Sequence, residues 1–384
     1  MIAFFIRGIY PCTVGGMEIF YYHLTKELSK NENLIVITDC KKGKKTQNIK
    51  YIIVNDRLFF IKRYGFGKVS IFLSTIFQIY RYRKEIDVIH ITTASSAGFF
   101  GSFFPFIKKI TNIPYVVSFH GGGLYPWSKA SFFPKLFKNA SRSIAVSSVI
   151  KETLERRTGV PFDLVMPLIP FTKSQKTKQE LRKQYGIAEN ARVIIMVGSL
   201  KSIKGSRFVV ESFCDLGKEH IKNNEIILVL AGDGEDKATI ENYIQSRGFS
   251  DYVKLTGSIP NEWIHELFAL SDIYVIASEF EGTSKSLLEA MFNSLPIVAS
   301  NVNGINNIIK DGCNGLLFEY NDKTSFLSKL QEINEDLEQS ERIANRAKSD
   351  YENNYSFDNI VKSYKEIFEE IRLEKLEQRK QKNN

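Results

Sequence analysis

The sequence predicts an α/β protein with parallel sheets in two domains. Short apolar runs such as residues 2–9 and 192–197 are typical of buried parallel strands, and each leads into a loop that contains glycine. At 384 residues, 43% of them hydrophobic, the chain can bury two ordinary cores. The pattern breaks into a proline-rich linker near residues 161–170, so we expect one domain over residues 1–168 and a second over residues 180–354.

Each expected domain contains a series of such strands. In the first domain the apolar runs that predict strands are residues 2–9, 34–38, 51–54, 87–91, 114–119 and 144–147. In the second domain they are residues 192–197, 226–230, 253–255, 273–277 and 297–299. The uncharged segment 88–107 is long enough to cross a bilayer, but its hydroxyl side chains, glycines and proline favour a buried strand, a loop and a helix.

The charge is divided unevenly between the two halves of the chain. Residues 1–178 hold 27 Lys and Arg against 10 Asp and Glu, whereas the remainder is acidic on balance. No helix-turn-helix, zinc-finger or RNP pattern accompanies the positive charge, so a nucleic acid is not an expected partner. An anionic membrane surface explains the basic half better.

Two basic segments interleave large apolar residues with Lys and Arg. Residues 57–84 contain no acidic side chain, and residues 125–142 have a similar composition. An interfacial amphipathic helix has this character, with apolar bulk for the acyl boundary and cations for the headgroups. A buried helix with a basic rim explains the first segment equally well, and the second segment favours membrane contact.

A phosphate site is predicted where residues 277–304 pass from a strand through a loop into a helix. The helix is expected to begin at about Thr283, so its first N–H groups and the positive end of its dipole favour an anion. The residues expected to supply this site are Gly282, Thr283, Ser284, Lys285, Ser286 and Leu287.

Two carboxylates bracket this anion position. Glu281 precedes the helix and Glu289 lies about 8–10 Å further along its axis, a separation that suits two hydroxylated rings on either side of a diphosphate. The alternative is a helix that is merely capped, because Ser286 and Glu289 have capping-box spacing and Glu281 complements the dipole.

The pattern formed by Glu281, Glu289 and residues 290–300 (AMFNSLPIVAS) resembles the signature of retaining, nucleotide-sugar-dependent glycosyltransferases of the GT-B fold, family 4 (group 1). The resemblance implies two Rossmann-like, doubly wound domains facing across a cleft, the first binding the acceptor and the second the nucleotide sugar. It also implies a last helix at about 355–374 that returns to the first domain, leaving residues 375–384 as a polar tail. The transferred sugar would contact Glu281, and the ribose hydroxyls would contact Glu289.

Other motifs carry the same resemblance. Gly15 and Gly16 follow the first strand, where the family places a loop against the donor diphosphate and the acceptor. His120 ends a strand at the edge where open α/β sheets bind ligands, and the family uses such a histidine to contact the donor sugar; a structural histidine is the alternative. His90, inside an apolar strand, is expected to be a satisfied core residue.

The second domain adds donor-binding residues and one departure. Gly232 belongs to a G-D-G turn, and Ile259 to the segment whose backbone receives the nucleobase in the family. Lys204 matches the lysine of the family pattern G-R-L-x-x-x-K-G, but Ser199 stands where that pattern has arginine. One phosphate contact is therefore lost unless Lys201 or Lys285 supplies the charge.

The activity that the resemblance implies is a retaining, metal-independent transfer of a sugar from a nucleotide-diphosphate sugar to an acceptor hydroxyl. His120 and Glu281 would position the sugar, and no metal or other cofactor is expected. The basic, aromatic first domain favours a lipid-linked or cell-envelope polysaccharide acceptor. The rival hypothesis is a non-catalytic, nucleotide-sugar-binding subunit that supports a partner transferase at the membrane.

The start of the sequence and the positions of its cysteines predict where the protein is located and whether it contains disulfides. No charged and then apolar leader precedes residue 2, so we expect a cytoplasmic protein, peripheral on the inner face of the membrane if it binds lipid. Cys12, Cys40, Cys214 and Cys313 are scattered without metal or redox spacing and are expected to be free thiols.

Overall fold

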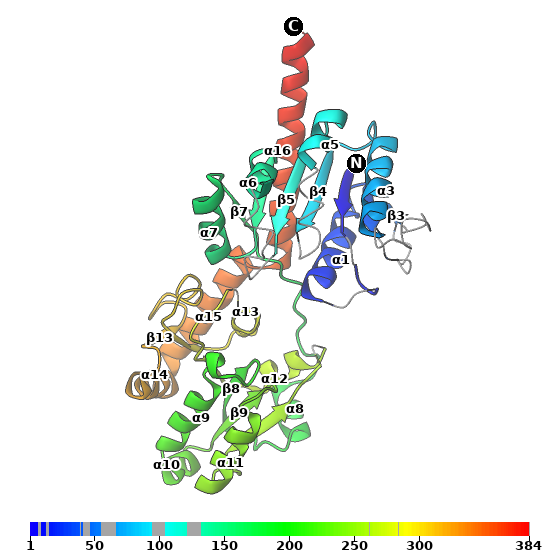
Figure 1. Ribbon diagram of the computed structural model, residues 1–384. Coiled ribbons are helices and arrows are strands. Elements are labelled where there is room, and N and C mark those ends of the chain that lie inside the picture. Colours follow the sequence, from blue (N-terminus) through cyan, green and yellow to red (C-terminus); the bar gives the residue numbers. More distant parts are fainter. Residues whose placement is uncertain are drawn as a thin grey trace. The chain divides into compact units, whose positions relative to one another are not determined.

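The chain forms two compact units. The computed structural model describes residues 1–383 except 7–8, 13–14, 39, 41–46, 55–66, 94–103, 121–131, 261 and 283. Unit 1 comprises residues 1–169 together with 357–384, and unit 2 comprises residues 170–356. Each unit is built on one sheet of parallel strands with helices around it (Figure 1).

The sheet of unit 1 has seven strands in the order β3-β2-β1-β4-β5-β6-β7, and every pairing is parallel. The strands are β1 (Ile2–Phe5), β2 (Leu34–Thr38), β3 (Ile49–Ile53), β4 (Val88–Thr93), β5 (Tyr115–Phe119), β6 (Arg142–Ala145) and β7 (Asp163–Leu164). Strands β1, β2 and β5 are buried throughout, as near-continuous apolar runs predict for strands that are covered on both faces.

Helices cover this sheet, and one of them comes from the far end of the chain. They are α1 (Gly16–Leu28), α3 (Gly67–Arg81), α5 (Phe104–Thr111), α6 (Phe132–Lys138), α7 (Ser148–Thr158) and α16 (Phe357–Asn383). Tyr364, Phe368 and Ile371 of α16 are buried in unit 1. Arg372 of the same helix donates to both carboxylate oxygens of Glu32, at 2.8 and 2.9 Å.

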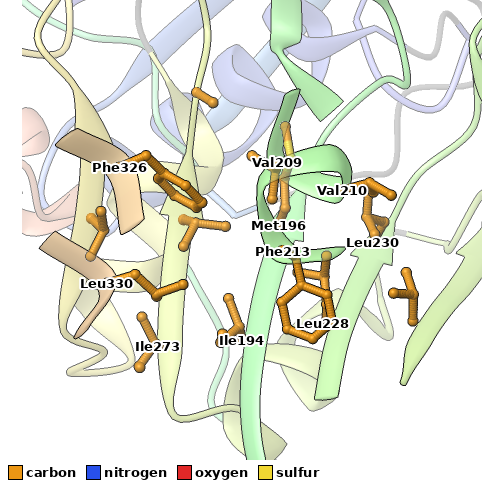
Figure 2. Close-up of a cluster of buried hydrophobic side chains, with 14 of the residues drawn as sticks. Ile194, Met196, Val209, Val210, Phe213, Leu228, Leu230, Ile273, Phe326 and Leu330 are labelled. Carbon is orange, nitrogen blue, oxygen red and sulfur yellow. The ribbon is translucent and has the colours of Figure 1, made fainter. Parts of the chain in front are cut away.

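The sheet of unit 2 has six parallel strands in the order β10-β9-β8-β11-β12-β13. The strands are β8 (Arg192–Val197), β9 (Ile226–Ala231), β10 (Val253–Gly257), β11 (Ile273–Ile276), β12 (Ile297–Ser300) and β13 (Leu316–Phe318). Figure 2 shows the core on one face of this sheet, where Ile194 and Leu228 of the strands pack with Phe213 and Phe326 of the helices.

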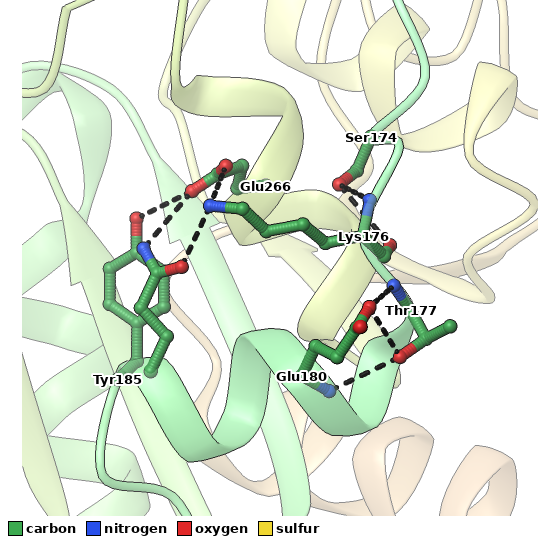
Figure 3. A network of polar contacts seen from close by, with 7 residues as sticks. Ser174, Lys176, Thr177, Glu180, Tyr185 and Glu266 are labelled. Carbon is green, nitrogen blue, oxygen red and sulfur yellow. Dashed lines mark hydrogen bonds and ion pairs between the residues drawn. The ribbon is translucent and has the colours of Figure 1, made fainter.

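The helices of unit 2 precede, connect and follow its strands in the chain. They are α8 (Lys178–Gln184), the single 3₁₀ turn η2 (Ser202–Lys204), α9 (Ser206–Asp215), α10 (Lys218–Asn223), α11 (Lys237–Arg247), α12 (Ile264–Leu270), α13 (Lys285–Phe292), α14 (Lys323–Glu335) and α15 (Leu337–Asn354). The start of α8 is fixed by a capping box between Thr177 and Glu180, and Lys176 beside it pairs with Glu266 at 2.8 Å (Figure 3). These contacts anchor the first helix of the unit to α12.

The predicted fold class is confirmed, with differences at the edges of the sheets. The strands β7 and β13 were not predicted, because two exposed residues and a three-residue run give too short a pattern. The helix predicted at about 355–374 is longer than expected, since α16 continues to Asn383 and includes nearly all of the polar tail predicted over residues 375–384. Glu, Lys, Gln, Arg and Leu dominate that stretch, and all are strong helix formers.

The prediction of four free thiols is wrong for two cysteines. Cys12 and Cys40 form a disulfide across a sequence separation of 28 residues, whereas Cys214 is a buried thiol and Cys313 an exposed one. Cys12 follows β1 and Cys40 follows β2, and these two strands are parallel neighbours. Their carboxyl ends lie at the same edge of the sheet, which brings together two cysteines that sequence spacing gave no reason to pair.

The first basic segment is described only in part, since residues 57–66 lie outside the described ranges. Helix α3 buries Thr75 and Ile79 against the unit 1 core and exposes Leu73, Phe77 and Tyr80. It therefore combines features of both interpretations, a packed helix and an apolar outer stripe. Within the described ranges, no helix has the length and apolar content needed to span a bilayer.

Candidate functional site

A cavity of about 440 Å³ lies at the carboxyl edge of the unit 2 sheet. Residues at the ends of β8, β9 and β11 line it together with the first turns of α13, which is where parallel α/β sheets bind ligands. The predicted donor-binding residues that line it are Ser199, Lys204, Gly232, Ile259, Glu281, Ser284, Lys285, Ser286 and Glu289. The cavity thus gathers residues that lie between Met196 and Glu289 in the sequence.

The helix α13 begins differently from the expectation. Ser284 is its N-cap, and the Ser284 Oγ accepts from the Leu287 N–H at 3.3 Å. The Leu287 N–H is therefore occupied and the Leu287 side chain is buried, so Leu287 was wrongly predicted to offer a free donor. The N–H groups of Lys285 and Ser286 have no acceptor among the described residues, and they remain the donors for an anion.

The predictions for Gly282, Thr283 and Ser286, which lie next to the start of α13, have different outcomes. Gly282 does not line the cavity, and Thr283 lies outside the described residues. The capping-box alternative is also wrong in detail, because Ser284 rather than Ser286 caps the helix. Ser286 instead accepts a hydrogen bond from the Tyr274 hydroxyl at 2.8 Å.

Glu281 is held on two sides. Lys204 Nζ donates to its Oε1 at 2.7 Å, and the Ser278 hydroxyl donates to the same oxygen at 2.7 Å. Ser278 is itself fixed, because its carbonyl accepts from the Ser300 hydroxyl at 2.7 Å. The Glu281 side chain is only 9% exposed, so this carboxylate is pre-positioned at the wall of the cavity.

Glycine is required beside Glu281. Gly304 has φ of +94°, and a Cβ at this position would lie 1.8 Å from the Glu281 carbonyl oxygen. Only glycine allows the loop after β12 to approach the Glu281 backbone so closely. The loop and Lys204 together set the position of the carboxylate.

Glu289 forms the second ion pair of the cavity. Lys285 Nζ lies 3.1 Å from Glu289 Oε1, one helical turn apart. Burial raises the pKa of Glu289 above its ordinary value, and the ammonium group of Lys285 opposes that rise. The cavity therefore contains two lysine–carboxylate pairs, Lys204 with Glu281 and Lys285 with Glu289.

The lining of the cavity shows which lysine adds positive charge where Ser199 replaces the arginine of the family pattern. Lys285 lines the cavity with Ser199 and Lys204, whereas Lys201 is exposed and is not part of the lining. A second cation is thus present near the position where the family pattern has arginine. An anionic ligand would meet two ammonium groups and two unpaired backbone N–H groups in this cavity.

Sequence reasoning missed Ser278 and Tyr274. Burial raises the pKa of Tyr274 well above its ordinary range, so its hydroxyl keeps its proton and donates to Ser286. The sequence does show that Tyr274 lies within an apolar strand and that Ser278 lies three residues before Glu281, and either position could have suggested a contact with the site. Only the folded chain shows that both hydroxyls contact site residues.

The remaining predicted residues belong to unit 1. Gly15 and Gly16 form the N-terminus of α1, and His120 directly follows β5. The His120 Nε2 lies 2.7 Å from the Tyr21 hydroxyl. Burial lowers the pKa of His120 to about 3, so its imidazole is neutral near pH 7 and suited to hydrogen bonding.

His90 is buried but only half satisfied. Its Nε2 lies 2.8 Å from the Ser118 Oγ, while its Nδ1 has no hydrogen-bond partner among the described residues. The prediction of a core histidine is confirmed, and the prediction that it is satisfied is wrong for one nitrogen. In the same described residues, no cluster of His, Cys, Asp and Glu has the grouping of a metal site.

Two family models match this chain, one in each half of the sequence. Residues 177–350 match the family model of glycosyl transferases group 1, and residues 14–166 match that of glycosyltransferase family 4. The alpha-D-kanosaminyltransferase of Streptomyces kanamyceticus is 24% identical over 288 residues, which is 70% of this chain and 73% of that protein.

Two further proteins extend the similarity. The alpha-monoglucosyldiacylglycerol synthase of Acholeplasma laidlawii is 24% identical over 265 residues, 63% of this chain and 65% of that protein. The solved structure of the Anabaena protein HepE in complex with UDP superimposes with a TM-score of 0.71 at 17% identity, covering 96% of this chain and 99% of that one. At this identity the structural similarity establishes the fold.

Proposed function

The chain belongs to the group 1 glycosyltransferases of family 4, with the GT-B fold, and from that premise we propose that it transfers a sugar from a nucleotide-diphosphate sugar to an acceptor hydroxyl with retention of configuration. The donor would occupy the unit 2 cavity. Its diphosphate would lie at the start of α13, with Glu281 facing the sugar and Glu289 the ribose.

One observation carries this proposal, which is the pairing of each carboxylate with a lysine in one cavity. Lys204 holds Glu281 at 2.7 Å, and Lys285 lies 3.1 Å from Glu289. A diphosphate competes with carboxylates for ammonium groups, so donor binding would draw both lysines to the phosphates. The two carboxylates would then be released to accept hydrogen bonds from sugar hydroxyls.

The proposal includes catalysis without a bound metal. Two ammonium groups and the unpaired N–H groups of Lys285 and Ser286 would stabilise the nucleotide diphosphate as it leaves. His120, neutral near pH 7, would orient the sugar by hydrogen bonding rather than protonate the leaving group. We assign no protein nucleophile.

The acceptor in this proposal is a lipid-linked or cell-envelope glycan, reached by docking of unit 1 on anionic lipid. Leu73, Phe77 and Tyr80 form an exposed stripe on α3, and Phe106 and Ile110 form another on α5. Both helices carry cations and no acidic side chain in the first turn. Apolar side chains among cations match the boundary between acyl chains and anionic headgroups. The Acholeplasma relative is named an alpha-monoglucosyldiacylglycerol synthase, and a lipid product of this kind agrees with a lipid acceptor.

A donor panel with detection of released nucleotide tests the transferase activity. We expect turnover with one nucleotide sugar in the presence of a lipid-linked glycan acceptor, unaffected by a chelator. Glu281→Ala is expected to lower kcat on the order of 100-fold, because the carboxylate that meets the sugar is lost. Glu279→Ala is the matched control, since this exposed carboxylate lies two residues away and outside the cavity lining.

The same experiment separates the rival hypothesis. A non-catalytic subunit would bind the donor in a calorimetric titration and release no nucleotide with any acceptor. Donor binding that survives unchanged in Glu281→Ala, Glu289→Ala and Lys204→Ala would place the donor outside the cavity and contradict the proposal.

Liposome sedimentation tests the membrane contact. We expect binding to vesicles with acidic lipid and much less to neutral vesicles, and we expect Phe77→Ser combined with Phe106→Ser to weaken it. Phe280→Ser is the control, because Phe280 is an exposed phenylalanine of unit 2. Equal, negligible binding to both vesicle types would refute lipid docking and leave the transferase proposal intact.

A further inference from the structure

A chain of buried polar side chains leads away from His120 into the core of unit 1. The Tyr21 hydroxyl lies 2.7 Å from the His120 Nε2 and interacts with the hydroxyls of Ser118 and Tyr364. The Ser118 Oγ lies 3.3 Å from the Tyr364 hydroxyl and 2.8 Å from the His90 Nε2. Four elements contribute, namely α1, β4, β5 and the returning helix α16.

None of these groups carries charge near pH 7. Burial lowers the pKa of each histidine to about 3, and burial raises the pKa values of Tyr21 and Tyr364. Each imidazole therefore has one N–H and one bare nitrogen, and each hydroxyl has one proton to donate. Along the unbranched path from His90 through Ser118, Tyr364 and Tyr21 to His120, the direction chosen at one end fixes the direction at the other.

The His90 end settles the direction. Its Nδ1 has no acceptor among the described residues, and the rings of Phe4 and Phe368 lie 5.0 and 6.2 Å from the His90 ring. Buried N–H groups without an acceptor are rare in folded proteins, so the nitrogen without a proton is assigned to Nδ1. The His90 proton then lies on Nε2, and that N–H donates to Ser118.

We propose that every hydrogen bond of this chain points from His90 toward His120. Ser118, having accepted from His90, donates its one proton to the Tyr364 hydroxyl, and Tyr364 in turn donates to Tyr21. The Tyr21 proton is then directed to the His120 Nε2. His120 is thereby fixed as the tautomer with its proton on Nδ1, and Tyr21 is a positioning residue for it.

The consequence for catalysis depends on the proposed function, whereas the direction of the chain does not. With Nε2 occupied by Tyr21, the Nδ1–H is the ring donor left for an oxygen of the ligand. The other tautomer has no proton on Nδ1, so it could not donate a hydrogen bond to that oxygen. A donated hydrogen bond from a fixed imidazole requires no reorganisation when the sugar arrives.

Nitrogen NMR of the histidine rings tests the direction without any activity measurement. The chain has five histidines, so two-bond proton–nitrogen spectra of protein labelled with ¹⁵N-histidine can be assigned with single histidine variants. We expect the wild-type protein to show His120 protonated on Nδ1 and His90 protonated on Nε2. A proton on His120 Nε2 or on His90 Nδ1 would overturn the proposal.

Hydroxyl deletions test the positioning role. Tyr21→Phe is expected to release the His120 tautomer and to lower kcat by about tenfold with little change in KM, as for other partners that orient a functional histidine. Tyr22→Phe, the same change at the adjacent position of α1, should leave both unchanged. Ser118→Ala interrupts the chain beyond Tyr21 and is expected to shift the ring signals of both histidines.

The outcomes separate this inference from the function. If Tyr21→Phe leaves the His120 ring signals unchanged, Tyr21 does not set the tautomer, and the positioning role is excluded. If the wild-type tautomers are as expected but no nucleotide sugar turns over, the transferase proposal fails while the direction of the chain holds.

Discussion

Lys285 determines how much positive charge the unit 2 cavity holds. The family pattern has arginine where this chain has Ser199, and Lys201 is exposed outside the cavity. Lys285, on the first turn of α13, is therefore the cation available besides Lys204 among the lining residues. At the same time it is the group that stabilises the buried charge of Glu289.

Removal of Lys285 should make stability depend more strongly on pH. A carboxyl group whose pKa is raised on folding keeps its proton longer in the folded chain, so the folded state loses stability as pH rises above the ordinary carboxyl value. Lys285→Met would raise the pKa of Glu289 further. We expect a loss on the order of 1 kcal/mol near pH 7 that shrinks toward pH 4.5, measured by urea unfolding at both pH values.

The double variant Lys285→Met with Glu289→Gln supplies the control. It removes the buried charge together with its partner, so the loss near pH 7 should largely disappear. Lys201→Met, a change at an exposed lysine outside the cavity, should have little effect at either pH. A pH-independent loss in Lys285→Met would mean that the methylene packing of Lys285, and not its charge, supports the site.

At the scale of single residues, the sequence identified the charged side chains that line the cavity and missed two hydroxyl side chains that contact them. Glu281, Glu289 and Lys204 stand at the spacings of a family motif, and the fold brings all three to one cavity. Ser278 and Tyr274 also contact site residues, but a serine or a tyrosine in a strand has many structural uses. Their role depends on which neighbour they face, and sequence spacing carries no information about that.

At the level of elements, the loop after β12 determines where the strand-to-helix loop of the site lies. Gly304 touches the Glu281 carbonyl so closely that a methyl group would displace one of the two backbones. The Glu281 N–H also points at the Asn303 carbonyl, at 3.4 Å. The site thus depends on a second loop that supplies no side chain to the cavity.

Gly304→Ala tests this dependence. We expect a loss of about 3 kcal/mol or more in stability, from positive-φ strain and the clash, together with a fall in kcat because Glu281 moves. Gly312→Ala is the matched control, since Gly312 has φ of +69° but open space around its Cβ position. It should cost about 1 kcal/mol, measured by urea unfolding, with kcat unchanged. Equal effects of both variants on kcat would refute the role of the close approach.

Helix α3 illustrates why one sequence pattern supported two interpretations. Its buried face, with Thr75 and Ile79, satisfies the requirement for a helix on a sheet, while Phe77 is 61% exposed on the other side. A helix that is apolar on most sides gives no clear periodicity, so burial and membrane contact predict the same composition. Only the packing shows which apolar residues are left for a partner.

At the scale of the whole molecule, the chain closes unit 1 with its last helix. The side chains of Tyr364, Phe368 and Ile371 are each 1% exposed, and they lie nearly 200 residues beyond the rest of that unit. The N-terminal amine also takes part, since it pairs with Asp87, which Arg372 approaches at 3.6 Å. Both ends of the chain therefore stabilise the same core.

Truncation after residue 356 should destabilise unit 1 and spare unit 2. It removes seven buried apolar residues of α16, and the three least exposed, Tyr364, Phe368 and Ile371, alone correspond to roughly 6 kcal/mol, comparable to the stability of a whole domain. Truncation after residue 374 is the control, because it keeps those side chains and the Arg372–Glu32 pair. Hydrogen exchange resolved by peptide is the measurement, and protection of β1 and β4 in the shorter variant would contradict the expectation.

The sequence by itself determined the succession of most strands, the α/β class and the charged residues that line the unit 2 cavity. These features follow from local periodicity and from short motifs, which do not depend on contacts with distant parts of the chain. The tertiary structure decided the Cys12–Cys40 disulfide, the pairing of each carboxylate with its lysine, and the contact between Tyr21 and His120. Each of these depends on which strand ends meet at one edge of a sheet or which side chains face each other, and parallel pairing of strands far apart in sequence is settled only when the whole core packs.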